Sequence, residues 1–193
     1  NFTTFHACCE SRDTNIHRIA DLVRGAVIPP GGQFSVNEYV GRRTAENGFV
    51  EAGAIRNGEH VSEVGGGVSQ FATTLFNAAY FAGLDIVEYQ AHSEYFSRYP
   101  RGREATMGFP APDLRIENTT PYGILIWTSY TDTSLTVTLW STPYVLADQT
   151  GIREARAGNC TVVTTERTRA YPDGRTEVDE FRATYRPGPG QFC

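Results

Sequence analysis

Residues 63–83 read EVGGGVSQFATTLFNAAYFAG, and this stretch decides the fold that the rest of the chain completes. Three consecutive glycines lead directly into a segment with the apolar spacing of one helical face. The residues on that face are Val68, Phe71, Ala72, Leu75, Ala79 and Ala82. Gly83 follows, and glycine most easily adopts the left-handed conformation that ends a helix. The stretch therefore predicts a central helix that begins near Ser69, directly after a glycine turn.

The start of this helix is a candidate functional site. Unpaired N–H groups and the positive end of the helix dipole gather there, so a nucleophile or a bound anion would be stabilised. Glycines have no Cβ, which allows positive φ angles and lets another group come close. Ser69 has two interpretations: it is a nucleophile in a site, or it caps the helix, as serine commonly does.

The composition indicates a globular protein of 193 residues, with 40% apolar and 12% aromatic residues. One domain, or one domain with a small appendage, is expected at this length. The net charge of −5 argues against nucleic acid as a partner. No segment has the apolar length of a membrane span, and the first residues do not form a signal peptide. We therefore expect any export signal or membrane anchor to lie upstream of Asn1.

Four cysteines lie near the two ends of the chain: Cys8, Cys9, Cys160 and Cys193. None has a second cysteine or a histidine at zinc-binding spacing, so the sequence predicts no metal site, and it predicts no cofactor. The even count favours two disulfides and an oxidising compartment. The pairing stays open between a Cys160–Cys193 bond that closes the last segment and one bond from each N-terminal cysteine to the two C-terminal ones.

Helix and strand signals along the chain predict an α+β fold. Thr14 or Asn15 is expected to cap a second, N-terminal helix that ends at Gly25 and packs on the central one. Asn57-Gly58 marks a hairpin turn. Strands that follow one another along the chain in this way are expected to form a mainly antiparallel sheet with helices on one face. Later strands are predicted at residues 85–89, 105–109, 114–117, 123–130 and 134–141.

The domain prediction divides the chain into three parts. Residues 1–143 form the main domain, and residues 144–159, where the pattern weakens, form a linker. Residues 160–193 form a disulfide-tied β-hairpin appendage, because two alternating segments flank a turn signal at residues 171–175. A lone hairpin is marginally stable, which is the reason to expect a disulfide at its ends.

Eight separated motifs occur in order: TNI at 14–16, PGGQFSVN at 30–37, GRRT at 41–44, the glycine-rich stretch at 65–79, AGL at 82–84, HS at 92–93, GREAT at 102–106 and DL at 113–114. Together they resemble the VanW-like family over about residues 12–140. The resemblance implies an exported or membrane-anchored bacterial protein of actinobacterial type, associated with vancomycin resistance, but supplies no activity. Family sequences commonly carry cysteine where this chain has Ser69, and a hydroxyl is a far weaker nucleophile than a thiolate.

Two functional hypotheses use the residues around the glycine turn. In the catalytic hypothesis, Ser69 attacks, His92 takes its proton and Asp113 orients the imidazole, for acyl transfer or amide hydrolysis on stem peptides. In the binding hypothesis, the turn and the loop of residues 94–104 line a groove, in which guanidinium groups grip carboxylates and aromatic rings stack on sugars or apolar groups. The loop mixes Tyr95, Phe96 and Tyr99 with Arg98, Arg101 and Arg103. The predicted ligand-binding residues are Gly65, Gly66, Gly67, Gln70, Tyr99, Arg101, Arg103 and Glu104.

These observations predict a cell-envelope domain that recognises or remodels peptidoglycan or its peptide precursors, with binding favoured over catalysis. Its expected location is extracytoplasmic, in the cell wall or anchored to the membrane through a region upstream of residue 1. A structural or assembly module of a surface protein, which would form a homo-oligomer, is the remaining alternative.

Overall fold

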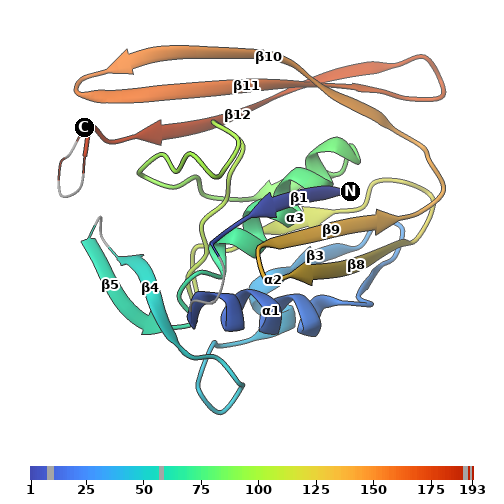
Figure 1. Ribbon diagram of the computed structural model, residues 1–193. Coiled ribbons are helices and arrows are strands. Elements are labelled where there is room, and N and C mark those ends of the chain that lie inside the picture. The colour runs from blue at the N-terminus through green and yellow to red at the C-terminus, as the bar shows by residue number, and fades with distance from the viewer. Residues whose placement is uncertain (8–10, 57–58, 189–190, 192) are drawn as a thin grey trace.

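The computed structural model describes residues 1–7, 11–56, 59–188, 191 and 193, and it has an α+β fold (Figure 1). The helices are α1 (Ser11–Val23), α2 (Val36–Val40) and α3 (Ser69–Phe81). The strands are β1 (Phe2–Phe5), β2 (Val27–Ile28), β3 (Gln33–Ser35), β4 (Glu51–Arg56), β5 (Glu59–Val64), β6 (Asp85–Glu88), β7 (Arg115–Glu117), β8 (Ile124–Thr131), β9 (Ser134–Trp140), β10 (Leu146–Ala157), β11 (Cys160–Ala170) and β12 (Thr176–Tyr185). The predicted fold class is confirmed.

Helix α3 lies at the centre of the molecule and is buried on every side from Gln70 to Tyr80. Strands β1, β6, β9 and β10 contact it. The sequence indicated a single apolar face, but polar side chains on the other faces are buried too, because they bond to backbone carbonyls: Thr73, Thr74 and Asn77. A helix covered on all sides is part of the core. No helix in the described ranges is long and apolar enough to cross a membrane.

Helix α1 begins at Ser11, earlier than predicted, so Asn15 lies inside the helix instead of at its N-cap. The Asn15 amide is fully buried and donates to the carbonyls of Val50 (2.9 Å) and Gly66 (2.8 Å). It also accepts from the N–H of Val50 at 2.8 Å. These tertiary hydrogen bonds outweigh the preference of asparagine for a cap. Helix α1 packs on α3, as predicted, and holds the glycine turn through Asn15.

Four antiparallel sheets are formed by the described residues, in the orders β1-β9-β8-β2, β3-β7-β6, β4-β5 and β10-β11-β12. The first sheet contacts α3 through β1 and β9, and α1 through β8. Residues 105–109, predicted as a strand, belong to the long connection between β6 and β7. The N–H of Ala105 in this connection donates to Thr73 Oγ1 at 3.1 Å. A helix side chain thus accepts the hydrogen bond that a neighbouring strand would accept if this segment lay in a sheet.

The predicted C-terminal hairpin is present as β11 and β12, and β10 pairs with β11 as a third strand. Strand β10 lies within the segment predicted as a linker. Its residues are mostly polar and exposed, so the sequence shows no clear alternation there. Of the pairings left open, the disulfide joins Cys160 to Cys193, whereas Cys8 and Cys9 lie outside the described residues.

The three-stranded C-terminal sheet packs on α3. The ring of Phe181 in β12 lies against Tyr80, with ring centroids 5.1 Å apart. Arg167 in β11 is 1% exposed, and its guanidinium donates to the carbonyls of Tyr80 and Leu84, both at 3.0 Å. Burial lowers the pKa of Arg167, and its ion pair with Asp179 opposes that shift. A buried guanidinium without these acceptors would be costly, so the bonds fix the sheet on the helix.

Candidate functional site

The turn Gly65-Gly66-Gly67 joins β5 to α3, and each glycine is required by the structure. Gly65 and Gly67 have φ angles of +88° and +92°, in the left-handed region that residues with side chains rarely adopt. Gly66 passes so close to β4 that a Cβ would lie 2.2 Å from the carbonyl oxygen of Ala52. The turn is therefore a tightly packed wall built only of backbone.

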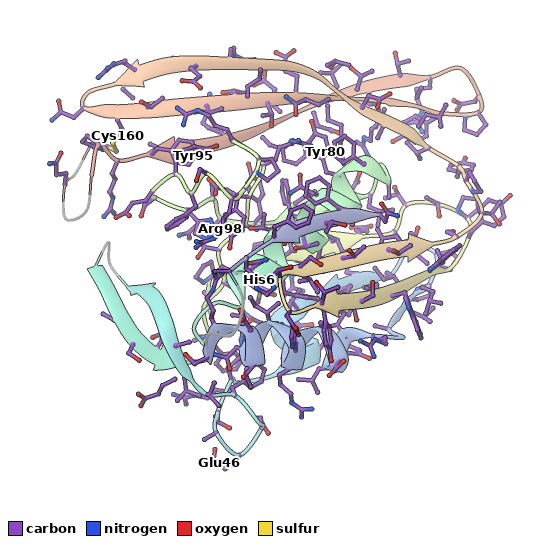
Figure 2. The ribbon with its side chains drawn as sticks, viewed as in Figure 1. His6, Glu46, Tyr80, Tyr95, Arg98 and Cys160 are labelled. Carbon is purple, nitrogen blue, oxygen red and sulfur yellow. A yellow bond between two sulfur atoms is a disulfide. The ribbon has the colours of Figure 1, made fainter. Side chains whose placement is uncertain are left out.

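A pocket of about 320 Å³ lies against this turn. The start of α1, the β4–β5 hairpin and the connection between β6 and β7 form its other walls. Figure 2 shows Arg98 on that connection, between the C-terminal sheet and the β4–β5 hairpin. No group of three His, Cys, Asp or Glu side chains in the described chain could hold a metal ion. The pocket is lined by Arg12, Gly53, Ala54, Glu63, Gly65, Gly66, Gly67, Val68, Ser69, His92, Phe96, Arg98, Tyr99, Thr106 and Met107.

Ser69 is the first residue of α3 and lines the pocket. The N-cap position belongs to Val68 and no side chain caps the helix, so Ser69 is not a capping serine. Its hydroxyl lies 3.3 Å from Thr106 Oγ1 and accepts a hydrogen bond from the N–H of Met107 at 3.1 Å. Those are its hydrogen bonds within the described part of the chain, and none joins it to His92.

His92 lines the same pocket and is only 8% exposed. Its Nδ1 lies 3.2 Å from Oε2 of Glu104, which is fully buried. The ring of Tyr99 stacks on the imidazole, with centroids 5.3 Å apart. Because Nδ1 faces the buried carboxylate, Nε2 on the other side of the ring faces the pocket. The imidazole thus lies between a carboxylate and a stacked ring, although Nδ1 and the carboxylate form no well-aligned hydrogen bond.

The Glu104 carboxylate links the pocket to the C-terminal sheet. The hydroxyl of Tyr185 in β12 lies beside it and accepts a hydrogen bond from the N–H of Gly102 at 2.8 Å. Burial raises the pKa of Tyr185, and the Glu104 carboxylate raises it further. Neither oxygen of the Glu104 carboxylate has a well-aligned hydrogen-bond donor among the described residues. The cost of burying this carboxylate is therefore offset by its polar neighbours His92 and Tyr185.

Asp113 does not occupy the role that the catalytic hypothesis gave it. Its Oδ2 accepts from the Ser35 hydroxyl at 2.5 Å, and its Oδ1 accepts from the N–H groups of Asn37 (2.9 Å) and Leu114 (2.8 Å). Both oxygens therefore serve the start of α2. The acid beside His92 is Glu104 instead, because the fold, and not the order of residues along the chain, determines which carboxylate reaches the ring.

The predicted ligand-binding residues divide into two groups. The three glycines of the turn and Tyr99 line the pocket. Arg101 points away and pairs with an acidic residue of β10, and Arg103 lies over aromatic rings of α3, where burial lowers its pKa. Gln70 is fully buried in the core, and Glu104 lies behind His92. Only half of the predicted ligand-binding residues therefore line the pocket.

Arg98 and Phe96 belong to the loop predicted to bind but were left out of the predicted ligand-binding residues, and both line the pocket. The Arg98 guanidinium lies over the rings of Phe96 and Tyr99, 4.7 Å and 5.1 Å from their centroids. Arg98 is exposed, and no acidic side chain in the described ranges pairs with it. The mixture of arginine and aromatic residues was the signal that pointed to this loop, but it did not show which of its residues face the pocket.

Arg12 of α1 was also missed, and no local pattern marks it. Its Nη2 donates to Gln70 Oε1 at 2.9 Å. The aliphatic part of its side chain packs against the glycine turn, so closely that a Cβ on Gly67 would lie 2.8 Å from the Cβ of Arg12. Arg12 and Arg98 thus reach the pocket from segments far apart in the sequence. Together with the α3 N-terminus they make its lining attractive to anions.

Residues 11–140, which contain all of the pocket lining, match the family described as VanW like protein. The chain belongs to this family. The uncharacterized protein YoaR of Bacillus subtilis (strain 168) is 37% identical over 143 residues, covering 74% of this chain and 47% of YoaR. The Vancomycin B-type resistance protein VanW of Enterococcus faecalis is 26% identical over 128 residues, covering 64% of this chain and 46% of that protein.

The predicted VanW-like resemblance is confirmed, and the second relative links the family to vancomycin resistance. The chain spans about half the length of the curated relatives it matches. No solved structure matches it. The match ends with β9, so the C-terminal sheet, whose Tyr185 lies beside Glu104, is outside the family region.

Proposed function

We propose that this VanW-like domain binds peptidoglycan, or its peptide precursors, in the bacterial cell envelope. The observation that carries the proposal is the pocket at the start of α3, which combines the guanidinium of Arg98, not paired with any acid of the described residues, with the flat rings of Phe96 and Tyr99. Peptidoglycan offers carboxylates on its stem peptides and sugar rings on its glycan strands. Guanidinium groups bind carboxylates, and aromatic faces stack on sugars or small apolar groups.

Two further findings support an extracytoplasmic location for the domain. The Cys160–Cys193 bond is of a kind that persists mainly in oxidising compartments. The Enterococcus relative is named for resistance to vancomycin, an antibiotic directed at the cell wall. The domain then works in the wall, or is held at the membrane by a region outside this chain. External protease should digest it in cells stripped of their wall, and protection there would contradict this location.

Sedimentation with purified, insoluble peptidoglycan tests the binding function. We expect the parent protein to sediment with peptidoglycan at low salt and Arg98→Ala to remain largely in the supernatant, because the variant lacks the guanidinium and its stacking on the two rings. Arg156→Ala is the matched control, since it removes the same charge from an exposed position of β10 outside the pocket. Failure of the parent protein to sediment at low salt would remove the proposal.

A second candidate function is acyl transfer or amide hydrolysis on stem peptides, which rests on the buried pair of His92 and Glu104 in the same pocket as Ser69. Glu104 then replaces Asp113 as the group that orients the imidazole. The Ser69 hydroxyl bonds to Thr106 and Met107, which favours binding over this alternative. Incubation with soluble muropeptides distinguishes the two: new products that disappear in Ser69→Ala would establish an enzyme, and unchanged muropeptides would leave binding alone.

A further inference from the structure

The N-terminal end of α3 presents free backbone donors to the pocket. No side chain caps this helix, and the N–H groups of Gly67 and Ser69 meet no hydrogen-bond acceptor within the described residues. Both residues line the pocket. Donors of this kind, with the positive end of the helix dipole behind them, stabilise a negatively charged group.

His92 is a second, independent indication of a ligand at this place. It is more than nine-tenths buried, yet Nε2 faces the pocket and has no hydrogen-bond partner among the residues that the structure describes. The ring packs between Glu104 and Tyr99, and Nδ1 lies on the side of the carboxylate. A polar atom on a largely buried ring that faces a cavity is positioned to bond a polar group of a ligand.

Arg98 supplies a charged group at the edge of the same pocket. Its guanidinium is held over two aromatic rings and is not paired with an acid of the described chain, so its donors are available to a bound carboxylate. Phe96, Tyr99 and Met107 give this part of the lining an apolar surface. The pocket thus offers donors for one small anion beside a surface suited to small apolar groups.

The charge of the lining favours a carboxylate over a phosphate. Glu63 also lines the pocket, so the lining is not purely cationic as the lining of a phosphate site commonly is. Phosphate sites commonly gather several cations or a metal ion, whereas here two arginines share the pocket with that carboxylate.

Resting on the proposed function, we propose that the pocket binds the free C-terminal carboxylate of a short peptide with small side chains, held by Arg98 and the N-terminal N–H groups of α3. The peptide chain then lies against Phe96, Tyr99 and Met107. His92 Nε2 contacts a polar group of the same peptide. The ligand is thus the free C-terminal end of a stem peptide. The glycan strand, or a peptide whose C-terminal carboxyl is already cross-linked to another peptide, would not bind in this way.

Calorimetric titration of the full chain with acetylated Lys-D-Ala-D-Ala, and with the same peptide as its C-terminal amide, tests this inference. We expect the free acid to bind at least about tenfold more tightly than the amide, because a hydrogen bond to a charged group contributes on that scale. Arg98→Ala should weaken binding of the acid by about tenfold and leave the amide unchanged. Arg156→Ala, exposed on β10, should match the parent protein.

The outcomes separate this inference from the proposed function. Equal binding of acid and amide, or full competition by inorganic phosphate, overturns the carboxylate assignment. Absence of binding to either peptide, with sedimentation on insoluble peptidoglycan intact, also overturns it but leaves the wall-binding function standing. Loss of both peptide binding and sedimentation removes the two proposals together.

Discussion

Replacing Ser69 by cysteine measures the electrostatic field at the start of α3 directly. A thiol has an ordinary pKa of about 8.5, and a thiolate here would meet the uncapped helix end and the N–H of Met107. The helix end should stabilise the thiolate by about 1 kcal/mol and the N–H by about 1.5 kcal/mol, while partial burial opposes this by about 1 kcal/mol. The net of about 1.5 kcal/mol lowers the pKa by about one unit, to about 7.5.

The assay for this Ser69→Cys variant is the rate of alkylation by iodoacetamide as a function of pH, with modification at position 69 followed by mass spectrometry. The midpoint of the profile is the useful quantity, because the intrinsic nucleophilicity of a thiolate falls as its pKa falls. Ser129→Cys, at an exposed position of β8, is the control and should have a midpoint near about 8.5. A midpoint for Ser69→Cys at or above that of the control would refute the reasoning, since burial would then outweigh the helix end.

Three further predictions concern stability. Gly66→Ala should lower the free energy of unfolding by about 3 kcal/mol, because its Cβ would lie 2.2 Å from a backbone oxygen, whereas Gly123→Ala has open space and should cost much less. The pKa of Tyr185 is raised in the fold, so its neutral hydroxyl adds stability that is lost as the pH rises above about 10, where the tyrosine of the unfolded chain ionises. In urea titrations at increasing pH, Tyr185→Phe should reduce this fall in the free energy of unfolding. An unchanged dependence of that free energy on pH would contradict the prediction. Replacing Cys160 and Cys193 together by serine should cost about 4 kcal/mol in denaturant melts, for a separation of 33 residues, and a cost near zero would contradict this.

Those parts of the fold that depend on local pattern could be predicted from the sequence. Helix α3 begins at Ser69, where the glycines predicted it to begin, and Gly83 follows it with a φ angle of +74°. Strand β10 could not be predicted, because its side chains are mostly exposed and polar on both faces and only its pairing with β11 makes it a strand. The start of α1 was misplaced, because the bonds made by Asn15 are with segments distant in sequence.

The candidate site shows the same division between local and distant information. The glycine turn was found because close backbone approach and positive φ require glycine itself. The choice of Asp113 as the partner of His92 was wrong, because the order of residue types along the chain does not determine which acid reaches the ring, and here the fold brings Glu104. Arg12 reaches the pocket from a helix far away in the chain, so no local pattern could indicate it.

The most direct test of the central claim is a nuclear magnetic resonance titration of the isotope-labelled domain with soluble muropeptides. If the pocket is the binding site, the backbone amide signals of residues 65–69 and the Nε2 signal of His92 should shift with a common saturation curve, because these groups face the ligand. The same titration of Arg98→Ala should shift them much less. Saturable shifts confined to other surfaces of the molecule, with the turn and His92 unchanged, would contradict the account.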